Sequence, residues 1–221
     1  MKKIKDLDEN FIGWIKTQLG KNLVIRKEKY GDQSEVYCIN TPRGSYFLKI
    51  AENLETECKK LKWLNGRLPI PEVIKFEHIG DKDVLLLSAV EGKNLAELKK
   101  EWPAEKVVSI LAKVLFQFHT ISTKDCPFGS QGKGKVLVHG DACLPNFIFK
   151  DDVFSGYIDL GDMRIDTPHI DLSAAVWSLQ YNLGSGFGLN FLEKYGVKNA
   201  TEELVEKLRL QYEETQKEWG L

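Results

Sequence analysis

Residues 136–149, with the sequence VLVHGDACLPNFIF, constrain the fold more than any other part of the chain. The apolar runs 136–138 and 147–149 are typical of short strands buried in a core. Between them lie the polar side chains of His139, Asp141 and Asn146. The pattern therefore predicts a polar loop that two buried strands hold rigidly.

Composition limits the classes of protein to consider. A chain of 221 residues can form one domain or two small lobes with a sizeable core. Its net charge of −1 gives no indication of nucleic acid as a partner. No apolar run approaches the roughly 20 residues that span a bilayer, and no apolar signal segment follows the first residues, so we expect a cytoplasmic protein without a membrane partner. The cysteines form no CxxC pair, which favours reduced thiols.

The pattern of elements changes along the chain. The first part alternates strand-like runs with two helical stretches, and the expected elements are strands 23–26, 36–39, 46–51, 73–77 and 84–88 and helices 8–19 and 53–64. The later part is mostly helical, with expected helices 104–121, 171–183, 187–195 and 201–217 and strands 136–138, 147–149 and 156–160. We therefore expect an α+β chain, with a β-rich N-terminal lobe at 1–90 and a mainly helical C-terminal lobe at 91–221.

Two charged residues stand in apolar patterns of the first lobe. Lys49 lies inside the apolar run 46–51, where the ordinary alternative is an edge-strand lysine whose stem reaches out to water. Glu57 lies on an apolar helical stripe, because leucines stand three residues before it and four and seven residues after it. A carboxylate that faces a core needs a cationic partner. The pattern predicts an ion pair of Lys49 and Glu57, unless Glu57 lies at the edge of the stripe.

The loop and the next strand offer further oxygen ligands. Asp159 stands at the end of the expected strand 156–160, and a hairpin would bring it close to Asn146. Carboxylate and amide oxygens suit Mg²⁺, which usually also keeps waters and phosphate oxygens. Asp141 would then orient, and deprotonate, an attacking hydroxyl. Turn chemistry is the ordinary alternative for Asp141 or Asn146 alone, but it accounts poorly for the whole set.

Taken together, these residues have the parts of a phosphoryl-transfer site. A lysine holds phosphates, a glutamate holds the lysine, two oxygen ligands hold a metal and an acid faces the nucleophile. The motif HGDACLPN at 139–146, followed by IDLG at 158–161, resembles the catalytic and metal-binding motifs of aminoglycoside phosphotransferases. The resemblance covers nearly the whole chain and is closest to the 3′-acting enzymes; it also includes 47–50, 63–64, 68–71, 86–92 and 166–172.

This resemblance implies a two-lobed protein-kinase-like fold and an ATP- and Mg²⁺-dependent O-phosphotransferase. It assigns the site residue by residue: Asp141 as catalytic base, Asn146 and Asp159 as Mg²⁺ ligands, Lys49 on the ATP phosphates with Glu57 positioning it, the backbone of Ser88 and Val90 on adenine, and the loop 31–34 over the phosphates. Whether GTP replaces ATP, and which oligomeric state forms, stay open.

Three other polar residues have structural interpretations. The resemblance makes His139 a residue that fixes the loop and Asp171 an acid beneath it. His119 ends an apolar helical pattern, which favours a hydrogen-bonded core histidine. The alternative is a metallohydrolase site on the H-x-D of His139 and Asp141, but no further histidine cluster supports it.

The acceptor is where the sequence departs from the family pattern. Only 20 positions separate His119 from His139, an interval that is much longer in the antibiotic kinases. Asp162 and Trp177 stand where related 3′-enzymes have arginines. Acids could still attract a polyamine sugar, and the candidates are Asp162, Glu213 and Glu214, although the glutamates are also typical of a solvated helix face. An aminoglycoside is the default acceptor; the alternatives are another small alcohol or sugar, or a nucleotide-binding pseudokinase.

Overall fold

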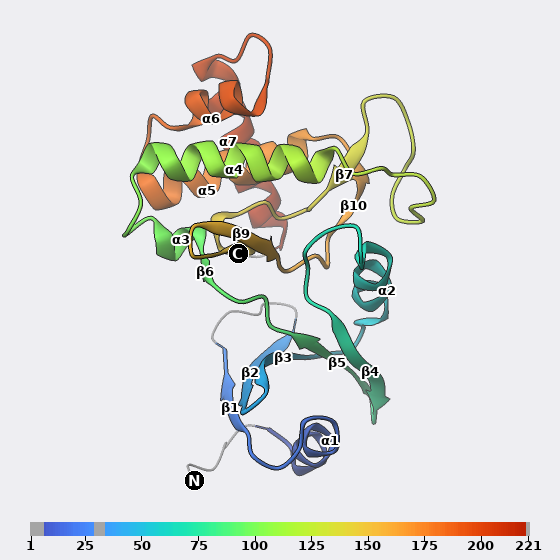
Figure 1. Cartoon of the computed structure of the whole chain (residues 1–221). Helices are drawn as coiled ribbons and strands as arrows, with labels where there is room; N and C mark the ends of the chain where they lie inside the picture. The colour runs from blue at the N-terminus through green and yellow to red at the C-terminus, as the bar shows by residue number, and fades with distance from the viewer. Residues whose placement is uncertain (1–6, 29–33, 220–221) are drawn as a thin grey trace. The chain divides into compact units, whose positions relative to one another are not determined.

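The computed structural model describes residues 7–28 and 34–219 (Figure 1). The chain divides into two compact units. The N-terminal unit comprises Met1–Lys62 and Pro71–Ala89, and the C-terminal unit comprises Trp63–Ile70 and Val90–Leu221. The stretch Trp63–Ile70 therefore belongs with the later part of the chain, where Pro69 O accepts a hydrogen bond from Tyr157 N at 3.0 Å.

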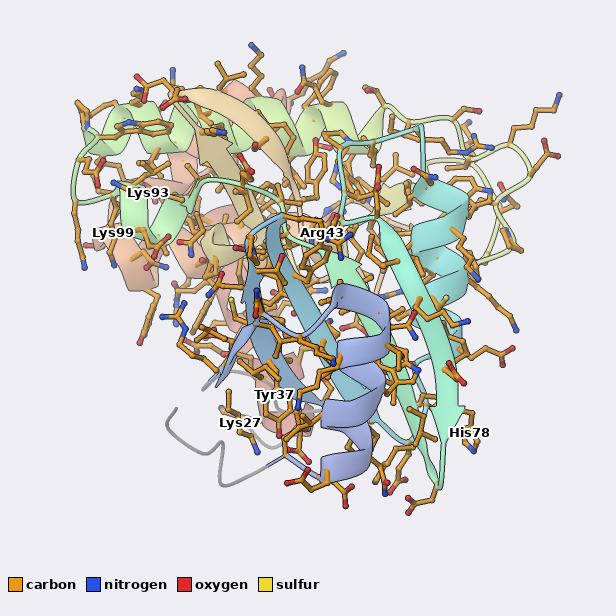
Figure 2. All side chains as sticks on the ribbon, turned by 60° about the horizontal axis from the view of Figure 1, so that its bottom comes forward. Lys27, Tyr37, Arg43, His78, Lys93 and Lys99 are labelled. Atoms are coloured by element: carbon orange, nitrogen blue, oxygen red, sulfur yellow. The ribbon has the colours of Figure 1, made fainter. Side chains whose placement is uncertain are left out.

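The N-terminal unit is a five-stranded antiparallel sheet in the order β1-β2-β3-β5-β4. Its elements are α1 (Glu9–Leu19), β1 (Val24–Lys27), β2 (Glu35–Thr41), β3 (Gly44–Ala51), α2 (Glu55–Leu64), β4 (Val73–Ile79) and β5 (Lys82–Ser88). Ile15 and Leu19 of α1 are buried with Ile39 and Leu48 of the sheet, so α1 covers one face of it, as Figure 2 shows. Asp8 caps α1 by accepting a hydrogen bond from Asn10 N at 2.7 Å.

One prediction for this sheet is settled by strand order. Lys49 lies on β3, which pairs with β2 through Val36 and with β5 through Leu85. The alternative that Lys49 is an edge-strand lysine is therefore wrong, because hydrogen-bonded strands lie on both sides of it.

The C-terminal unit is mainly helical and includes two small antiparallel sheets. Its helices are α3 (Leu95–Leu98), α4 (Ala104–His119), the 3₁₀ turn η1 (Leu144–Asn146), α5 (His169–Leu183), α6 (Gly188–Tyr195) and α7 (Glu202–Trp219). The strands β6 (Lys93–Asn94), β8 (Phe147–Lys150) and β9 (Val153–Tyr157) form one sheet, and β7 (Val136–Val138) pairs with β10 (Arg164–Asp166). The apolar face expected for α4 is buried, including Val107, Leu111 and Phe118.

Several predicted bounds need correction. The strand expected at 156–160 is β9, which begins at Val153, because the hairpin turns at Asp151 and Asp152. It ends at Tyr157, which pairs with Phe147 at the start of β8. Both aspartates adopt positive φ (50° and 64°) without a glycine to signal the turn. The helix expected to reach residue 121 ends at His119. The short elements α3, β6, η1 and β10 were not predicted.

Two further expectations concern the membrane and the thiols. Across residues 7–28 and 34–219, no helix is both long and apolar enough to cross a bilayer. Cys38, Cys58, Cys126 and Cys143 are free and buried.

Candidate active site

The N-terminal unit contains the predicted ion pair. Lys49 Nζ lies 2.8 Å from Glu57 Oε1, and the two side chains are only 14% and 11% exposed. Glu57 stands in the first turn of α2. The start of that helix is held by buried Asp83 of β5, which accepts a hydrogen bond from Leu54 N at 2.8 Å. The prediction of this pair is therefore confirmed.

Asp83 also shows why α2 begins where it does. Burial alone would raise the pKa of Asp83, but the hydrogen bonds from His78 and Leu54 N hold the pKa below its ordinary value. A charged carboxylate beneath the first turn favours the helix N-terminus, where unpaired N–H groups lie. The start of α2, and with it Glu57, is thereby fixed to the sheet that contains Lys49.

An ion pair links β1 and β2, the strands on either side of the expected phosphate-covering loop. Glu35, which opens β2, accepts hydrogen bonds at 2.7 Å from both Lys27 and Tyr37, whose side chains Figure 2 labels. The hydrogen bond from Lys27 lowers the pKa of Glu35. Of the expected loop 31–34, residues 31–33 lie outside the described residues, so the role given to this loop stays a prediction.

In the C-terminal unit, a fully buried acid organises the polar loop. Asp171, near the start of α5, accepts hydrogen bonds from His139 N at 2.6 Å, from Gly140 N at 2.8 Å and from His119 Nε2 at 2.8 Å. Its exposed fraction is 0%. The backbone that precedes Asp141 is therefore held by two hydrogen bonds to one side chain, and the structural interpretation of Asp171 is confirmed.

Gly140 lets the loop pass close to Asp162, in the segment that follows β9. Its φ is +94°, and a Cβ placed on it would lie 2.6 Å from both Cβ and O of Asp162. Only glycine fits this conformation and this contact. The same contact shows that Asp162, itself exposed, lies directly against the loop.

The two histidines are structural, as predicted. His139 is fully buried, with Nε2 at 3.0 Å from Ile158 O, and its Nδ1 accepts a hydrogen bond from Asp141 N at 3.3 Å. These partners require a proton on Nε2 and a lone pair on Nδ1, so both ring nitrogens are in use. His119 lies between Tyr195 Oη at 2.6 Å and Asp171. The metallohydrolase alternative is not supported, since the described part of the chain contains no cluster of three His, Cys, Asp or Glu residues suited to a metal.

Asp141 and Asn146 meet at the end of this loop. Asn146 Nδ2 donates to the carbonyl oxygen of Asp141 at 2.9 Å and to its Oδ2 at 2.8 Å. Neither bond uses the amide oxygen of Asn146, and that oxygen is the atom that suits a hard cation. The 3₁₀ turn that positions Asn146 is held by α5, because Ser178 Oγ accepts from Leu144 N at 2.9 Å.

The β8–β9 hairpin brings Asp159 to the same loop, as the sequence predicted. Ile158 N donates to Asn146 O at 3.0 Å, so the residue before Asp159 is bonded directly to the other expected ligand. Asp159 is exposed and adopts φ +58°. A left-handed conformation outside glycine costs roughly 1–2 kcal/mol and often accompanies functional sites.

The expected adenine contacts lie on either side of a unit boundary. Ser88 ends β5, and its N–H donates to Glu72 O at 2.9 Å. Val90 begins the next stretch of the C-terminal unit. The adenine role of these two residues stays a prediction.

The acids expected to bind the acceptor divide by their surroundings. Glu213 of α7 pairs with Arg209, which also bonds Glu206 at 2.7 Å. The hydrogen bond from Arg209 lowers the pKa of Glu206. This network matches the solvated helix face more closely than an acceptor acid. Glu214 is exposed on the same helix, and Asp162 lies against the loop.

One contact of the site was not predicted. Tyr212 of α7 donates a hydrogen bond to Asp141 Oδ1 at 2.9 Å across a separation of 71 residues. Its ring lies 5.3 Å from that of Trp177 on α5. In the sequence, Tyr212 looks like an ordinary apolar position of an amphipathic helix, so no local signal pointed to it.

Comparison with known proteins identifies the family of this chain. A family model described as the phosphotransferase enzyme family matches residues 31–135 and 132–208. An aminoglycoside 3′-phosphotransferase from Niallia circulans is 27% identical over 83% of this chain and 88% of its own length. A probable aminoglycoside 3′-phosphotransferase from Lactococcus lactis subsp. lactis is 38% identical over 80% of this chain and 84% of its own length.

Solved structures show the same fold at low identity. The crystal structure of an aminoglycoside-3′-phosphotransferase of type VIII has a TM-score of 0.71 at 18% identity, over 92% of this chain and 98% of the other. The Streptomyces rimosus aminoglycoside phosphotransferase APH(3″)-Id, in complex with ADP and streptomycin, has a TM-score of 0.69 at 18% identity, over 90% and 95%. The fold expected from the sequence is confirmed. The chain belongs to the phosphotransferase enzyme family, which includes the aminoglycoside phosphotransferases, and is itself a phosphotransferase.

Proposed function

We propose that this enzyme transfers the γ-phosphoryl group of ATP to a hydroxyl of a small molecule, by default an aminoglycoside. The observation that supports this most is the setting of Asp141. Its two carboxylate oxygens accept separate hydrogen bonds, and its backbone follows a loop that buried Asp171 holds in place. A fixed carboxylate of this kind can orient a hydroxyl and take its proton.

The other residues have supporting roles in the proposal. Lys49, paired with Glu57, binds phosphate oxygens of the nucleotide. The amide oxygen of Asn146 and the carboxylate of Asp159 are hard donors that fit Mg²⁺. When bound, this cation would neutralise charge on the phosphates. Ser88 and Val90 hold the adenine. Because ATP is the co-substrate, the proposal places the enzyme in the cytoplasm.

The choice of an aminoglycoside as the default acceptor is based on the related proteins. The matched curated proteins are named as aminoglycoside 3′-phosphotransferases, and solved relatives are described with streptomycin or gentamicin. Asp162, beside the loop, and Glu214, exposed on α7, are the acids we propose for a cationic acceptor. Glu213 is a weaker choice, because Arg209 already neutralises it.

A second acceptor class has one observation in its favour. Between the end of α4 at His119 and the start of β7 at Val136, the chain forms no helix. The family resemblance implies that this interval is longer in the antibiotic kinases, where its helices wall the acceptor site. A smaller alcohol or sugar needs a smaller binding surface, so it is the alternative acceptor.

The test is phosphate transfer with a panel of acceptors. The purified enzyme is incubated with Mg²⁺ and ATP and with aminoglycosides or small alcohols, while ADP release is followed and products are weighed by mass spectrometry. A phosphate adduct on an aminoglycoside, absent with Asp141→Asn, supports the default acceptor. An adduct only on a small alcohol selects the alternative. ATP binding without any adduct across the panel contradicts the proposed transfer.

A further inference from the structure

The C-terminal helix α7 reaches the polar loop through one residue. Tyr212 is only 6% exposed, and its hydroxyl lies 2.9 Å from Asp141 Oδ1 and 3.4 Å from Cys143 Sγ. Asp141 and Tyr212 are 71 positions apart in the sequence, so the fold brings them together. The contact is therefore a feature of tertiary structure that needs its own explanation.

Which group donates in each of these hydrogen bonds follows from the protons that the carboxylate, phenol and thiol carry. A carboxylate only accepts, so the phenol proton of Tyr212 points to Asp141. The oxygen of Tyr212 and the backbone oxygen of Ala174, 3.8 Å from Cys143 Sγ, are then alternative acceptors for the one thiol proton. Burial, and then the nearby charge of Asp141, raises the pKa of Cys143 well above its ordinary value, so the thiol keeps its proton. Burial likewise raises the pKa of Tyr212 above its ordinary value, so the phenol remains a donor at neutral pH.

The ring of Tyr212 is held as firmly as its hydroxyl. It packs against Trp177 of α5 with ring centroids 5.3 Å apart and an interplanar angle of 47°. Trp177 in turn stacks on Tyr181, one turn further along α5, at 5.2 Å and 9°. These contacts leave the phenol little freedom to rotate away from Asp141.

We propose that Tyr212 is a positioning residue for phosphoryl transfer, because it and Asn146 hold opposite oxygens of the Asp141 carboxylate. The two donors come from separate elements, α7 and the 3₁₀ turn, and together they fix rotation of the carboxylate about its Cβ–Cγ bond. Each carboxylate oxygen has a second lone pair, so the acceptor hydroxyl can still bind. This inference rests on the proposed function, in which Asp141 orients that hydroxyl.

The experiment compares two tyrosines that differ in their partners. Tyr212→Phe removes the hydroxyl but keeps the ring against Trp177. Tyr157→Phe is the matched control, because Tyr157 is also buried and its hydroxyl donates to the backbone oxygen of Val114 at 2.8 Å. We expect Tyr212→Phe to lower kcat about tenfold with the KM of ATP within about twofold of wild type. The control should lose thermal stability to a similar degree and keep its kcat.

Each other result overturns the inference or separates it from the proposed function. Equal kcat in Tyr212→Phe and wild type would show that Tyr212 is only structural, and a higher kcat would show that the phenol competes with the acceptor hydroxyl. If wild type transfers no phosphate, the proposed function fails, and a double-mutant cycle in urea unfolding decides the positioning contact. Non-additive effects of Asp141→Ala and Tyr212→Phe then support it, and additive effects refute it.

Discussion

Replacing Asp171 by asparagine should loosen the loop that presents Asp141 while leaving the protein folded. The carboxylate accepts three hydrogen bonds in a fully buried place, from His139 N, Gly140 N and His119 Nε2. An amide has only one acceptor oxygen. Its best orientation keeps the two bonds that now use Oδ2 and turns the NH₂ group toward Gly140 N–H, donor against donor.

The magnitude can be worked from these bonds. One buried N–H left without an acceptor costs about 1–3 kcal/mol. The two remaining hydrogen bonds go to a neutral instead of a charged acceptor, which weakens each by about 1 kcal/mol. We therefore expect Asp171→Asn to lower the free energy of unfolding by about 4 kcal/mol. That is a large part of a typical stability of roughly 5–15 kcal/mol, but it leaves most of the protein folded.

The assay combines urea unfolding with hydrogen exchange. Tryptophan fluorescence, to which Trp177 on the same helix as Asp171 contributes, reports unfolding of the protein, and exchange at the His139 and Gly140 amides reports the loop itself. Asp152→Asn is the control, because its carboxylate accepts two hydrogen bonds, against three for Asp171, but is 67% exposed. We expect the control to change stability by less than about 0.5 kcal/mol. A loss below about 1 kcal/mol in Asp171→Asn, with exchange at both amides unchanged, would refute the reasoning.

Three further substitutions test the Lys49–Glu57 pair, the glycine of the loop and the ion pair of Asp166. Glu57→Gln removes the charge of the carboxylate that lies 2.8 Å from Lys49 Nζ, so the KM of ATP in the transfer assay should rise about tenfold. An unchanged KM would speak against a phosphate-binding role. Gly140→Ala adds a Cβ 2.6 Å from Asp162 at positive φ, and should cost about 2–4 kcal/mol in chemical unfolding; a loss under about 1 kcal/mol would mean that the loop adapts freely. The hydrogen bond from Lys135 lowers the pKa of Asp166 from 3.8 to about 2, so Asp166→Asn should cost about 1 kcal/mol near pH 7. The difference should shrink as the pH falls below about 4 and vanish below about 2. A difference between wild type and Asp166→Asn that is constant with pH would contradict that ion pair.

Features that repeat within one element were predictable from the sequence. The Lys49–Glu57 pair followed from a period of two on the strand and a period of 3.6 on the helix, because each charge stood inside an apolar pattern. The hairpin that brings Asp159 beside Asn146 followed from two short strands in succession. The start of its second strand was missed, because Asp151 and Asp152 turn the chain with positive φ and the sequence has no glycine there.

Contacts between distant segments were not predictable in the same way. Asp171 was assigned beneath the loop by resemblance to a known family, and periodicity alone would have shown only an acid in the first turn of a helix. Tyr212 and Asp141 are 71 positions apart, and the packing of α7 against α5 that joins them leaves no repeating signal in either helix. Such pairs depend on how helices pack, which the pattern of one helix does not determine.

The measurement that tests the central claim most directly is calorimetric binding of a non-hydrolysable ATP analogue, with and without Mg²⁺. The account predicts that Asp141→Asn binds the analogue as wild type does but transfers no phosphate from ATP, because Asp141 acts on the acceptor. It also predicts that Asp159→Ala loses the part of the affinity that depends on Mg²⁺. Wild-type affinity and Mg²⁺ dependence in Asp159→Ala, together with full transfer by Asp141→Asn, would contradict the assignment of this loop and hairpin as the phosphoryl-transfer site.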